Sequence, residues 1–419
     1  MTEIKSPRGT ADILPVEQSY WEYIRKEIAT ICQLYGYQRI DTPMFEETAL
    51  FIRGVGKETE VVQKQMYTFN DNSGTSITLR PEGTAPVCRA YIEHGMQNML
   101  QPVKLFYLSP AFRYERPQAG RYRQHWQFGV EAIGEEDPAL DAEVIDMGWH
   151  FYQRLGLSEL SLKLNSIGCQ LCRPPYLNAL KDYYAKCAAE LCPECKEKLV
   201  RSPLRLLDCK NATCRELAEA APQSTDYLCT ECKNHFDQLQ HYLTLLNIPF
   251  TRDSCLVRGL DYYTKTVFEF LPHEEGAQSA LGGGGRYDNL IEELGGKHTP
   301  AIGFATGIER IILNLKRANI SIPSLPGPTI YIAYLGEQAK EEALKLAEEL
   351  RQHSIPTITS LGSRSLKAQM RQANATGAAQ VITIGENEIK NNTVELRDMV
   401  RAQQKTIPRK ELLGLLKIN

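Results

Sequence analysis

The segment from Phe112 to Glu131 concentrates charged and turn-forming residues in a pattern suited to binding anions. It carries four arginines within eleven positions, together with Pro117 and Gly120, and then alternates apolar and polar residues. This pattern predicts an antiparallel hairpin with a basic tip. Its guanidinium groups can bind phosphate or carboxylate, although a solvated surface hairpin would need no ligand at all. The rest of the chain decides between these two interpretations.

A second segment, Thr78–Thr84, places a carboxylate and a hydroxyl beside a proline and a glycine. The spacing predicts that Glu82 and Thr84 lie at the end of a strand and face a cleft, where they can bind an ammonium group. The alternative is a helix N-terminus capped by Thr84, with Glu82 in solvent.

A third segment carries Arg258 within an apolar run, residues 255–260, that predicts a strand. An arginine among apolar neighbours needs an anionic partner, which is either a ligand or, as a structural alternative, Asp261. Tyr262 and Tyr263 follow, and tyrosine hydroxyls suit a small polar ligand with a heteroaromatic ring.

The fourth feature is a pair of glycine-rich segments, Gly282–Asp288 and Gly303–Arg310. Glycines before a helix would let a nucleotide approach the backbone, and Arg310 is expected in the first turns of such a helix. Neither segment has the spacing of a phosphate-binding loop or of the dinucleotide fingerprint.

The elements that must position these residues divide the chain into several parts. Amphipathic patterns predict helices over 15–34, 85–95 and 138–155, and strands over 37–45, 76–80, 104–113, 124–133 and 160–167. Strands in succession favour an antiparallel sheet. Beyond a proline-rich linker, residues 321–328, strands and helices alternate in a small α/β domain, residues 329–419. The first part thus comprises residues 1–167 and 254–320, interrupted by a helical insertion, residues 168–253.

Composition and net charge argue against a protein that attracts nucleic acid through its overall charge. The 419 residues carry a formal net charge of -3, so any polyanionic partner must be bound by local patches. The N-terminus does not resemble a signal peptide, and we find no apolar run long enough to span a bilayer, so we expect a cytoplasmic protein without a membrane partner.

Cysteine is concentrated in the insertion, where nine of the twelve cysteines lie between Cys169 and Cys232. In a cytoplasmic chain this favours metal ligands or free thiols over disulfides. Two Cys-x-x-Cys pairs predict one zinc site, with Cys192, Cys195, Cys229 and Cys232 as ligands. Rival ligands are Cys209 and Cys214, or Cys169 and Cys172, and buried free thiols are the alternative to a metal.

Taken together, the motifs resemble those of class II aminoacyl-tRNA synthetases. The segment 303–310 is similar to motif 3 of that class, residues 112–115 to the start of motif 2, and the helix and strand ending at Pro43 to motif 1. Within the class, Arg-Gly-Leu-Asp-Tyr-Tyr at 258–263 resembles the characteristic motif of the histidyl-tRNA synthetase family, and the likeness extends over essentially the whole chain.

The resemblance implies an α+β catalytic domain with a mostly antiparallel sheet, a helical cysteine-rich insertion, and a C-terminal α/β anticodon-binding domain. It implies activation of L-histidine with ATP, transfer of histidine to a tRNA, a need for Mg²⁺, and a homodimer. By motif match, Arg113 would bridge the α-phosphate and the histidine carboxylate, Arg258 would stabilise the pentacovalent phosphorus, and Arg310 would hold the γ-phosphate.

The remaining site residues also follow from the resemblance. The histidine site would comprise Glu82, Gly83, Thr84, Arg113, Gln127, Glu131, Arg258, Tyr262 and Tyr263. The ATP site would comprise Arg113, Glu115, Arg121, His125 and Arg310, where His125 replaces the phenylalanine usual in the family. The acceptor end of the tRNA would meet Arg116, Gln118 and Arg123. The main rival is the synthetase-like regulatory subunit of ATP phosphoribosyltransferase, which normally lacks the C-terminal domain and the catalytic arginines.

Overall fold

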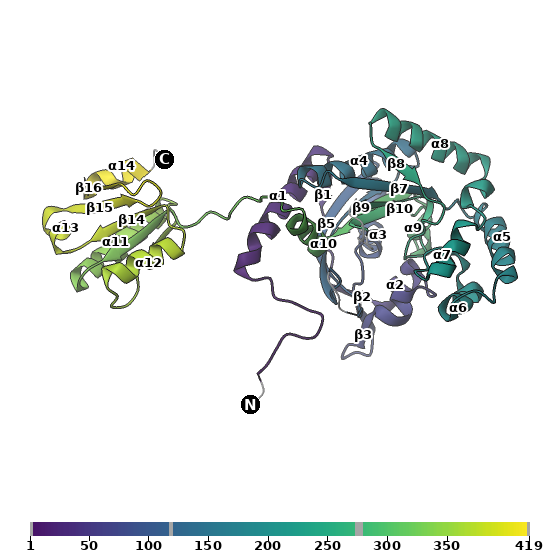
Figure 1. Ribbon diagram of the computed structural model, residues 1–419, viewed down its shortest axis with the longest axis horizontal. Coiled ribbons are helices and arrows are strands. Elements are labelled where there is room, and N and C mark those ends of the chain that lie inside the picture. The colour runs from purple at the N-terminus through teal and green to yellow at the C-terminus, as the bar shows by residue number, and fades with distance from the viewer. Residues whose placement is uncertain (1–2, 117–119, 273–279, 417–419) are drawn as a thin grey trace. The chain divides into compact units, whose positions relative to one another are not determined.

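The computed structural model describes residues 3–116, 120–272 and 280–416. The chain divides into two compact units, Met1–Pro323 and Ser324–Asn419 (Figure 1). Within the described residues, no helix is both long and apolar enough to cross a membrane.

The first unit is built on an eight-stranded sheet with the order β1-β5-β6-β11-β10-β9-β7-β8. These strands are β1 (Gln38–Arg39), β5 (Val103–Phe112), β6 (Gln124–Ile133), β7 (Leu160–Ser166), β8 (Phe250–Arg252), β9 (Thr264–Pro272), β10 (Gly282–Arg286) and β11 (Ala301–Gly307). Only the outer pairs, β1 with β5 and β7 with β8, are parallel. The predicted mostly antiparallel sheet is therefore confirmed.

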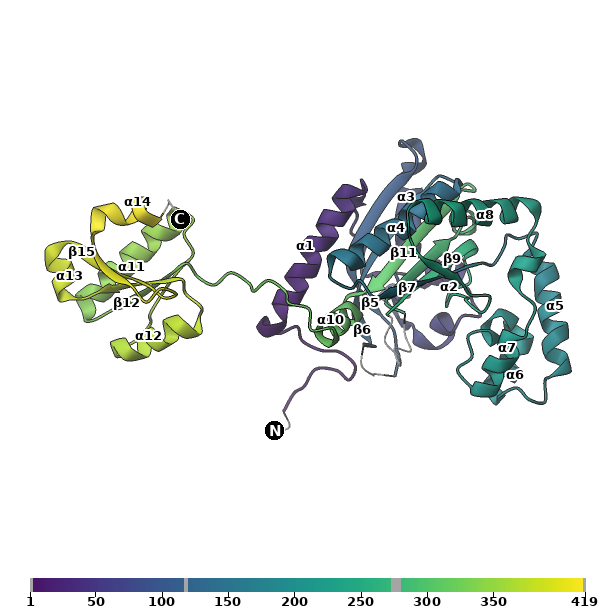
Figure 2. The ribbon, with the colours of Figure 1, turned by 45° about the horizontal axis from the view of Figure 1, so that its top comes forward.

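Four helices cover one face of this sheet (Figure 2). They are α1 (Gln18–Leu34), α4 (Pro138–Arg154), α8 (Thr230–Leu245) and α10 (Ile308–Arg317). Helix α4 starts where Pro138 occupies the first turn and the Asp137 carboxylate accepts a hydrogen bond from the backbone N–H of Ala139. Apolar side chains of these helices pack on Phe128 and Val130 of β6, and form the largest core of the chain.

The predicted functional residues of strand β6 lie on the opposite face of the sheet. Successive side chains of a strand point to opposite faces, so the burial of Phe128 and Val130 under the helices turns Gln127 and Glu131 to the other side. Smaller elements complete that side: α2 (Thr48–Val55), α3 (Thr84–Glu93), α9 (Leu290–Glu293) and a three-stranded sheet of β2 (Phe45–Glu47), β3 (Tyr67–Asn70) and β4 (Ser76–Leu79).

The cysteine-rich segment, predicted as a helical insertion over 168–253, is mostly helical, but its last part, α8 and β8, belongs to the eight-stranded sheet and its helical layer, and its cysteines group differently. Its helices are α5 (Arg173–Lys186), α6 (Pro193–Arg201), α7 (Ala212–Glu219) and the start of α8. The thiols of Cys192 and Cys195 cluster with Cys209 and Cys214, whereas those of Cys229 and Cys232 cluster with Cys169 and Cys172. The predicted ligand set that joined the two Cys-x-x-Cys pairs is wrong, because α6 and α8 begin in different parts of the module.

The second unit is an α/β fold around a five-stranded sheet with the order β13-β12-β14-β15-β16. Its strands are β12 (Ile330–Tyr334), β13 (Thr357–Thr359), β14 (Gln380–Ile384), β15 (Thr393–Asp398) and β16 (Gln404–Pro408), and its helices are α11 (Glu337–Gln352), α12 (Leu366–Ala375), α13 (Glu386–Asn391) and α14 (Leu412–Leu416). Strands β12, β13 and β14 are parallel, as alternating strands and helices require.

Two local predictions fail near the site. Residues 255–260 form a loop, because the Asp253 side chain and carbonyl accept the backbone N–H groups of Cys255 and Leu256 and turn the chain. The run Gly282–Arg286, interpreted as glycines that precede a helix, is strand β10 in the middle of the sheet. Glycines are used there because neighbouring atoms occupy the space above the strand: a Cβ on Gly284 would lie 1.9 Å from the Gly303 carbonyl oxygen.

Candidate active site

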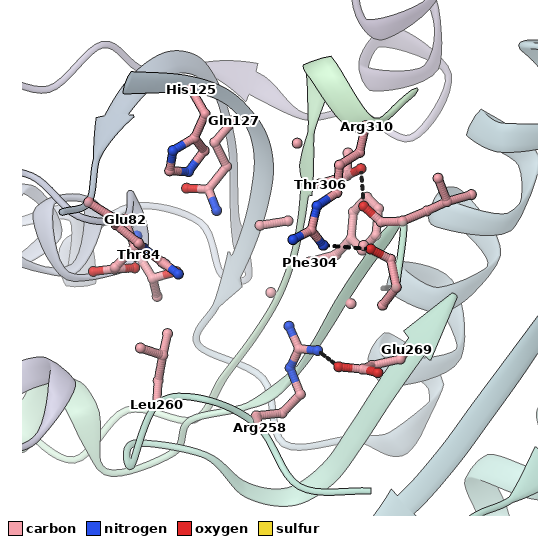
Figure 3. Close-up of a pocket in the computed structure, with 18 of the residues that line it drawn as sticks. Glu82, Thr84, His125, Gln127, Arg258, Leu260, Glu269, Phe304, Thr306 and Arg310 are labelled. Carbon is pink, nitrogen blue, oxygen red and sulfur yellow. Dashed lines mark hydrogen bonds and ion pairs between the residues drawn. The ribbon is translucent and has the colours of Figure 1, made fainter. Parts of the chain in front are cut away.

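The exposed side of the sheet holds a pocket of about 340 Å³, in which four segments of the chain meet. Figure 3 shows side chains of β6, the Glu82–Thr84 turn, the Arg258 loop and the β11–α10 junction facing one another across it. Twelve of the residues predicted from the sequence line this pocket: Glu82, Thr84, Arg113, Glu115, Arg121, His125, Gln127, Glu131, Arg258, Tyr262, Tyr263 and Arg310.

Glu131 is the buried carboxylate at one end of the pocket. The Thr84 hydroxyl donates to its Oε1 at 2.7 Å, the Tyr107 hydroxyl donates to the same atom at 3.5 Å, and the Tyr287 hydroxyl donates to Oε2. Burial nevertheless raises the pKa of Glu131 to about 8, because the charged form is poorly solvated there. The side chain can therefore carry a proton near neutral pH and exchange it with a basic ligand.

Glycines make room for this arrangement on the neighbouring strands. Gly303 lies opposite Glu131 in the β6–β11 ladder, and a Cβ there would lie 2.0 Å from Glu131 Oε2. Gly129 lies opposite Tyr107 in the β5–β6 ladder, and a Cβ there would lie 2.3 Å from the tyrosine ring. Gly83, a predicted histidine-binding residue, is not itself a lining residue, and a Cβ there would meet the same ring at 2.3 Å. These glycines are required for close packing of the pocket floor.

Glu82 both lines the pocket and caps helix α3. Its carboxylate accepts the backbone N–H of Thr84 at 2.6 Å and that of Ala85 at 2.9 Å. The structural alternative, in which Thr84 caps the helix and Glu82 is in solvent, is wrong, since Glu82 is buried and Thr84 donates its hydroxyl to Glu131. Burial raises the pKa of Glu82 despite these hydrogen bonds.

Arg258 reaches the pocket from its loop and pairs with Glu269 of β9, as the dashed line in Figure 3 marks. It does not pair with Asp261, whose carboxylate lies 3.4 Å from Arg205 instead. A Cβ on Gly283 would lie 2.8 Å from Arg258 Nη1, so a glycine there leaves space for the guanidinium group. Its Nε has no hydrogen-bond partner within the described parts of the chain, and can donate to a ligand.

Arg113 and Arg310 complete the cationic end of the pocket. The Nε of Arg113 donates to the Pro81 carbonyl at 2.8 Å, and Arg310, in the first turn of α10, donates to the Ala280 carbonyl at 2.8 Å. His125 is held near both, and burial together with these two cations lowers its pKa to about 3. Its ring is therefore neutral at physiological pH, which suits stacking on a heteroaromatic base.

Of the residues predicted to meet the tRNA, Arg116 and Arg123 do not line this pocket. Arg116 is exposed, and Arg123 lies 3.8 Å from the centre of the Tyr114 ring. Gln118 lies outside the described residues. These positions leave the tRNA assignment a prediction.

Sequence reasoning missed several residues that line the pocket or hold its lining side chains. Tyr107 and Tyr287 hold Glu131, and Glu269 pairs with Arg258, while Asp208 and Lys210 enter the lining from the cysteine-rich segment. Strand alternation in β5 shows which side chains share a face of the sheet with Tyr107. Only the register of β5 with β6 shows that Tyr107 lies opposite Gly129.

Comparison with known proteins agrees with this geometry. A family model described as histidyl-tRNA synthetase matches residues 9–311. The chain belongs to this family. A second model, the anticodon binding domain, matches residues 329–419.

Individual relatives support the family along the whole chain. A histidine–tRNA ligase of Dehalococcoides mccartyi (strain 195) is 57% identical over 413 residues, covering 99% of both chains. One from Desulforudis audaxviator is 50% identical, covering 99% of this chain and 98% of its own. The crystal structure of the apo histidyl-tRNA synthetase of S. aureus matches with a TM-score of 0.84 at 41% identity, covering 99% of each chain.

Proposed function

We propose that this chain is a histidine–tRNA ligase, which converts L-histidine and ATP into histidyl-adenylate and pyrophosphate and then transfers histidine to the 3′-terminal adenosine of its tRNA. One observation carries the proposal from the site itself. A single pocket has a buried carboxylate held by three hydroxyl groups, and Arg113, Arg258 and Arg310 line the same pocket. Such a pocket matches a ligand with a weakly basic ring at one end and a phosphate chain at the other.

Activation joins two anionic groups, so cations must neutralise and align them. The histidine carboxylate attacks the α-phosphorus, and the bond to the bridging oxygen breaks as pyrophosphate leaves. Arg113 would contact both the carboxylate and the α-phosphate, Arg258 the developing charge at phosphorus, and Arg310 the γ-phosphate. Mg²⁺ is expected with ATP, and Glu269 lines the pocket beside Arg258, where a carboxylate fits the ligand set of phosphate-bound Mg²⁺.

Selection of histidine requires partners for both ring nitrogens. Glu131 would bind one of them and Tyr263 the other, while Glu82, Thr84 and Gln127 receive the α-amino group. The hydroxyls already held by Glu131 keep its carboxylate oriented toward the pocket. A pocket built to satisfy two ring nitrogens rejects side chains that lack them, because its buried polar groups would then remain unpaired.

ATP binding and the second step extend this site. Glu115, Arg121 and His125 would surround the adenosine, and Arg116, Gln118 and Arg123 would approach the tRNA end, where the adenosine hydroxyl attacks the histidyl carbonyl and AMP leaves. Residues 1–167 and 254–320 would form the catalytic domain, with 168–253 inserted, and residues 329–419, after the linker 321–328, would bind the anticodon. The family resemblance further leads us to expect a homodimer working in the cytoplasm.

Aminoacylation tests the proposal. Purified chain, ATP, Mg²⁺ and radioactive histidine should place the label on unfractionated bacterial tRNA, and omission of ATP or tRNA should abolish the signal. The regulatory-subunit alternative is less supported, since relatives named histidine–tRNA ligase match along 99% of the chain. That alternative predicts no labelled tRNA.

A further inference from the structure

The cysteine-rich segment carries two compact groups of thiols that the ligase reaction does not use. The first group lies at the two ends of the segment and the second lies between them. The members of the first are Cys169, Cys172, Cys229 and Cys232, and those of the second are Cys192, Cys195, Cys209 and Cys214. Within each group all four sulfur atoms lie within 4.8 Å of one another, and all twelve cysteines of the chain are free thiols.

The spacing of the sulfur atoms matches a tetrahedral metal site. With a zinc–sulfur bond of about 2.3 Å, the four ligands of a tetrahedral site lie about 3.8 Å apart. The Sγ atom of Cys169 lies 3.6 Å from that of Cys172 and 4.0 Å from that of Cys229. In the second group, the Sγ atoms of Cys192 and Cys209 are 3.9 Å apart.

Helix starts and backbone N–H groups hold several of these sulfur atoms in place. Cys172, Cys192 and Cys229 are the N-cap residues of α5, α6 and α8. Backbone N–H groups also donate to sulfur, from Cys229 to Cys172 at 3.0 Å and from Cys192 to Cys214 at 3.4 Å. Such hydrogen bonds orient metal ligands.

We propose that the chain binds two structural zinc ions, each through one of these four-cysteine groups. A tetrahedral all-sulfur site is typical of zinc or of iron–sulfur centres. Four protein ligands close the site, and zinc in such a site acts in folding, not in chemistry. Here each ion would join segments that are distant along the chain, so its role is to fix the shape of the insertion.

The first zinc site would fasten the insertion to the histidine pocket. Cys172 is followed by Arg173, whose guanidinium donates to the backbone carbonyl of Tyr263. Gly168 precedes Cys169, and its carbonyl accepts the N–H of Lys265 at 2.9 Å. The site therefore lies where both ends of the insertion meet the start of β9, directly beside a residue that lines the pocket.

The second zinc site would position part of the pocket wall. Cys209 lies between Asp208 and Lys210, and both of these line the pocket. The neighbouring Arg205 reaches Asp261 on the Arg258 loop at 3.4 Å. Loss of this metal would free the segment that carries Lys210, which offers the pocket a cation from outside the catalytic domain.

Metal analysis of the purified full-length chain tests the proposal. Elemental analysis after exhaustive dialysis, and after reconstitution with zinc sulfate, should give two zinc ions per chain. The double variant Cys169→Ser with Cys229→Ser and the double variant Cys192→Ser with Cys209→Ser should each retain one. Cys187→Ser is the matched control, because Cys187 lies in the same module outside both groups, and it should retain two.

Cobalt substitution of the wild-type chain tests the same proposal without any variant, so its result does not depend on whether the variants fold. Wild-type chain reconstituted with Co²⁺ should show intense sulfur-to-metal charge-transfer absorption that saturates at two equivalents. Native mass spectrometry on the same sample should find two metal ions per chain. After the sample is denatured in the presence of a chelator, twelve reduced thiols per chain should be found. A stoichiometry of one or none, iron in place of zinc, or a disulfide within either group would overturn the proposal.

Discussion

Replacement of Glu131 by alanine tests how the pocket selects its amino acid. In the unliganded site the Glu131 carboxylate accepts hydrogen bonds from Thr84, Tyr107 and Tyr287, and it is almost fully buried. The substitution would remove the partner of one imidazole nitrogen and leave three hydroxyl groups beside a cavity. The arginines that line the pocket make none of the hydrogen bonds to Glu131 and would be untouched.

The expected magnitude follows from the loss of one hydrogen bond to a charged group, about 1.5–3 kcal/mol. Since 1.4 kcal/mol corresponds to a tenfold change in an equilibrium constant, the Michaelis constant for histidine should rise about 10- to 150-fold. The Michaelis constant for ATP should change less than about threefold, because no ATP contact is assigned to Glu131.

Pyrophosphate exchange at varied histidine and ATP concentrations measures both constants. Glu309→Gln is a matched control: Glu309 is a half-buried carboxylate that lines the same pocket, burial raises its pKa to about 7, and it accepts the backbone N–H of Trp126. That variant should lose stability without a selective effect on histidine. An unchanged histidine constant in Glu131→Ala, or an equal rise for ATP, would refute the assignment.

Four further predictions follow from the site. The pKa of Glu131 in the folded chain, about 8, exceeds its ordinary value of 4.5, so its contribution to folding stability is complete below about pH 4.5 and is lost as the pH rises toward 8. Thermal unfolding should therefore show a steeper loss of stability from pH 5 to 8 in the wild type than in Glu131→Gln, and equal slopes would contradict the raised pKa. Arg258→Ala should lower the rate of pyrophosphate exchange by about 10²- to 10³-fold at saturating substrates, and a rate within tenfold of wild type would exclude a transition-state role. His125→Phe should preserve the Michaelis constant for ATP while His125→Ala raises it about fivefold in the same assay, and equal values for the two variants would exclude stacking. Affinity for tRNA, measured by filter binding, should fall steeply between 50 and 200 mM salt, about 10³-fold for six phosphate contacts, whereas a flat response would exclude phosphate contacts.

Much of the hairpin and its site could be predicted from local pattern. Alternation predicted strands over 104–113 and 124–133, and the structure has β5 at Val103–Phe112 and β6 at Gln124–Ile133. The same alternation that buries Phe128 turns Gln127 and Glu131 toward the pocket. The resemblance to synthetases then supplied the residues of the other segments, which no single pattern would have brought together.

The failures lie where partners are set by tertiary structure. The apolar run around Arg258 favoured a strand, but a turn at Asp253 makes this segment a loop. From this loop, Arg258 pairs with Glu269 of strand β9. The cysteine pairing failed for the same reason, since spacing identifies a Cys-x-x-Cys unit but not its partner. Likewise, two of the three hydroxyls that hold Glu131 belong to Tyr107 of β5 and Tyr287 just after β10, and only the sheet register brings them to it.

The most direct test of the central claim is histidine-dependent exchange of radioactive pyrophosphate into ATP by the purified chain without tRNA. The account predicts that label enters ATP when histidine and Mg²⁺ are present, and that phenylalanine supports no exchange above background. Absence of exchange with histidine, or equal exchange with phenylalanine, would contradict it.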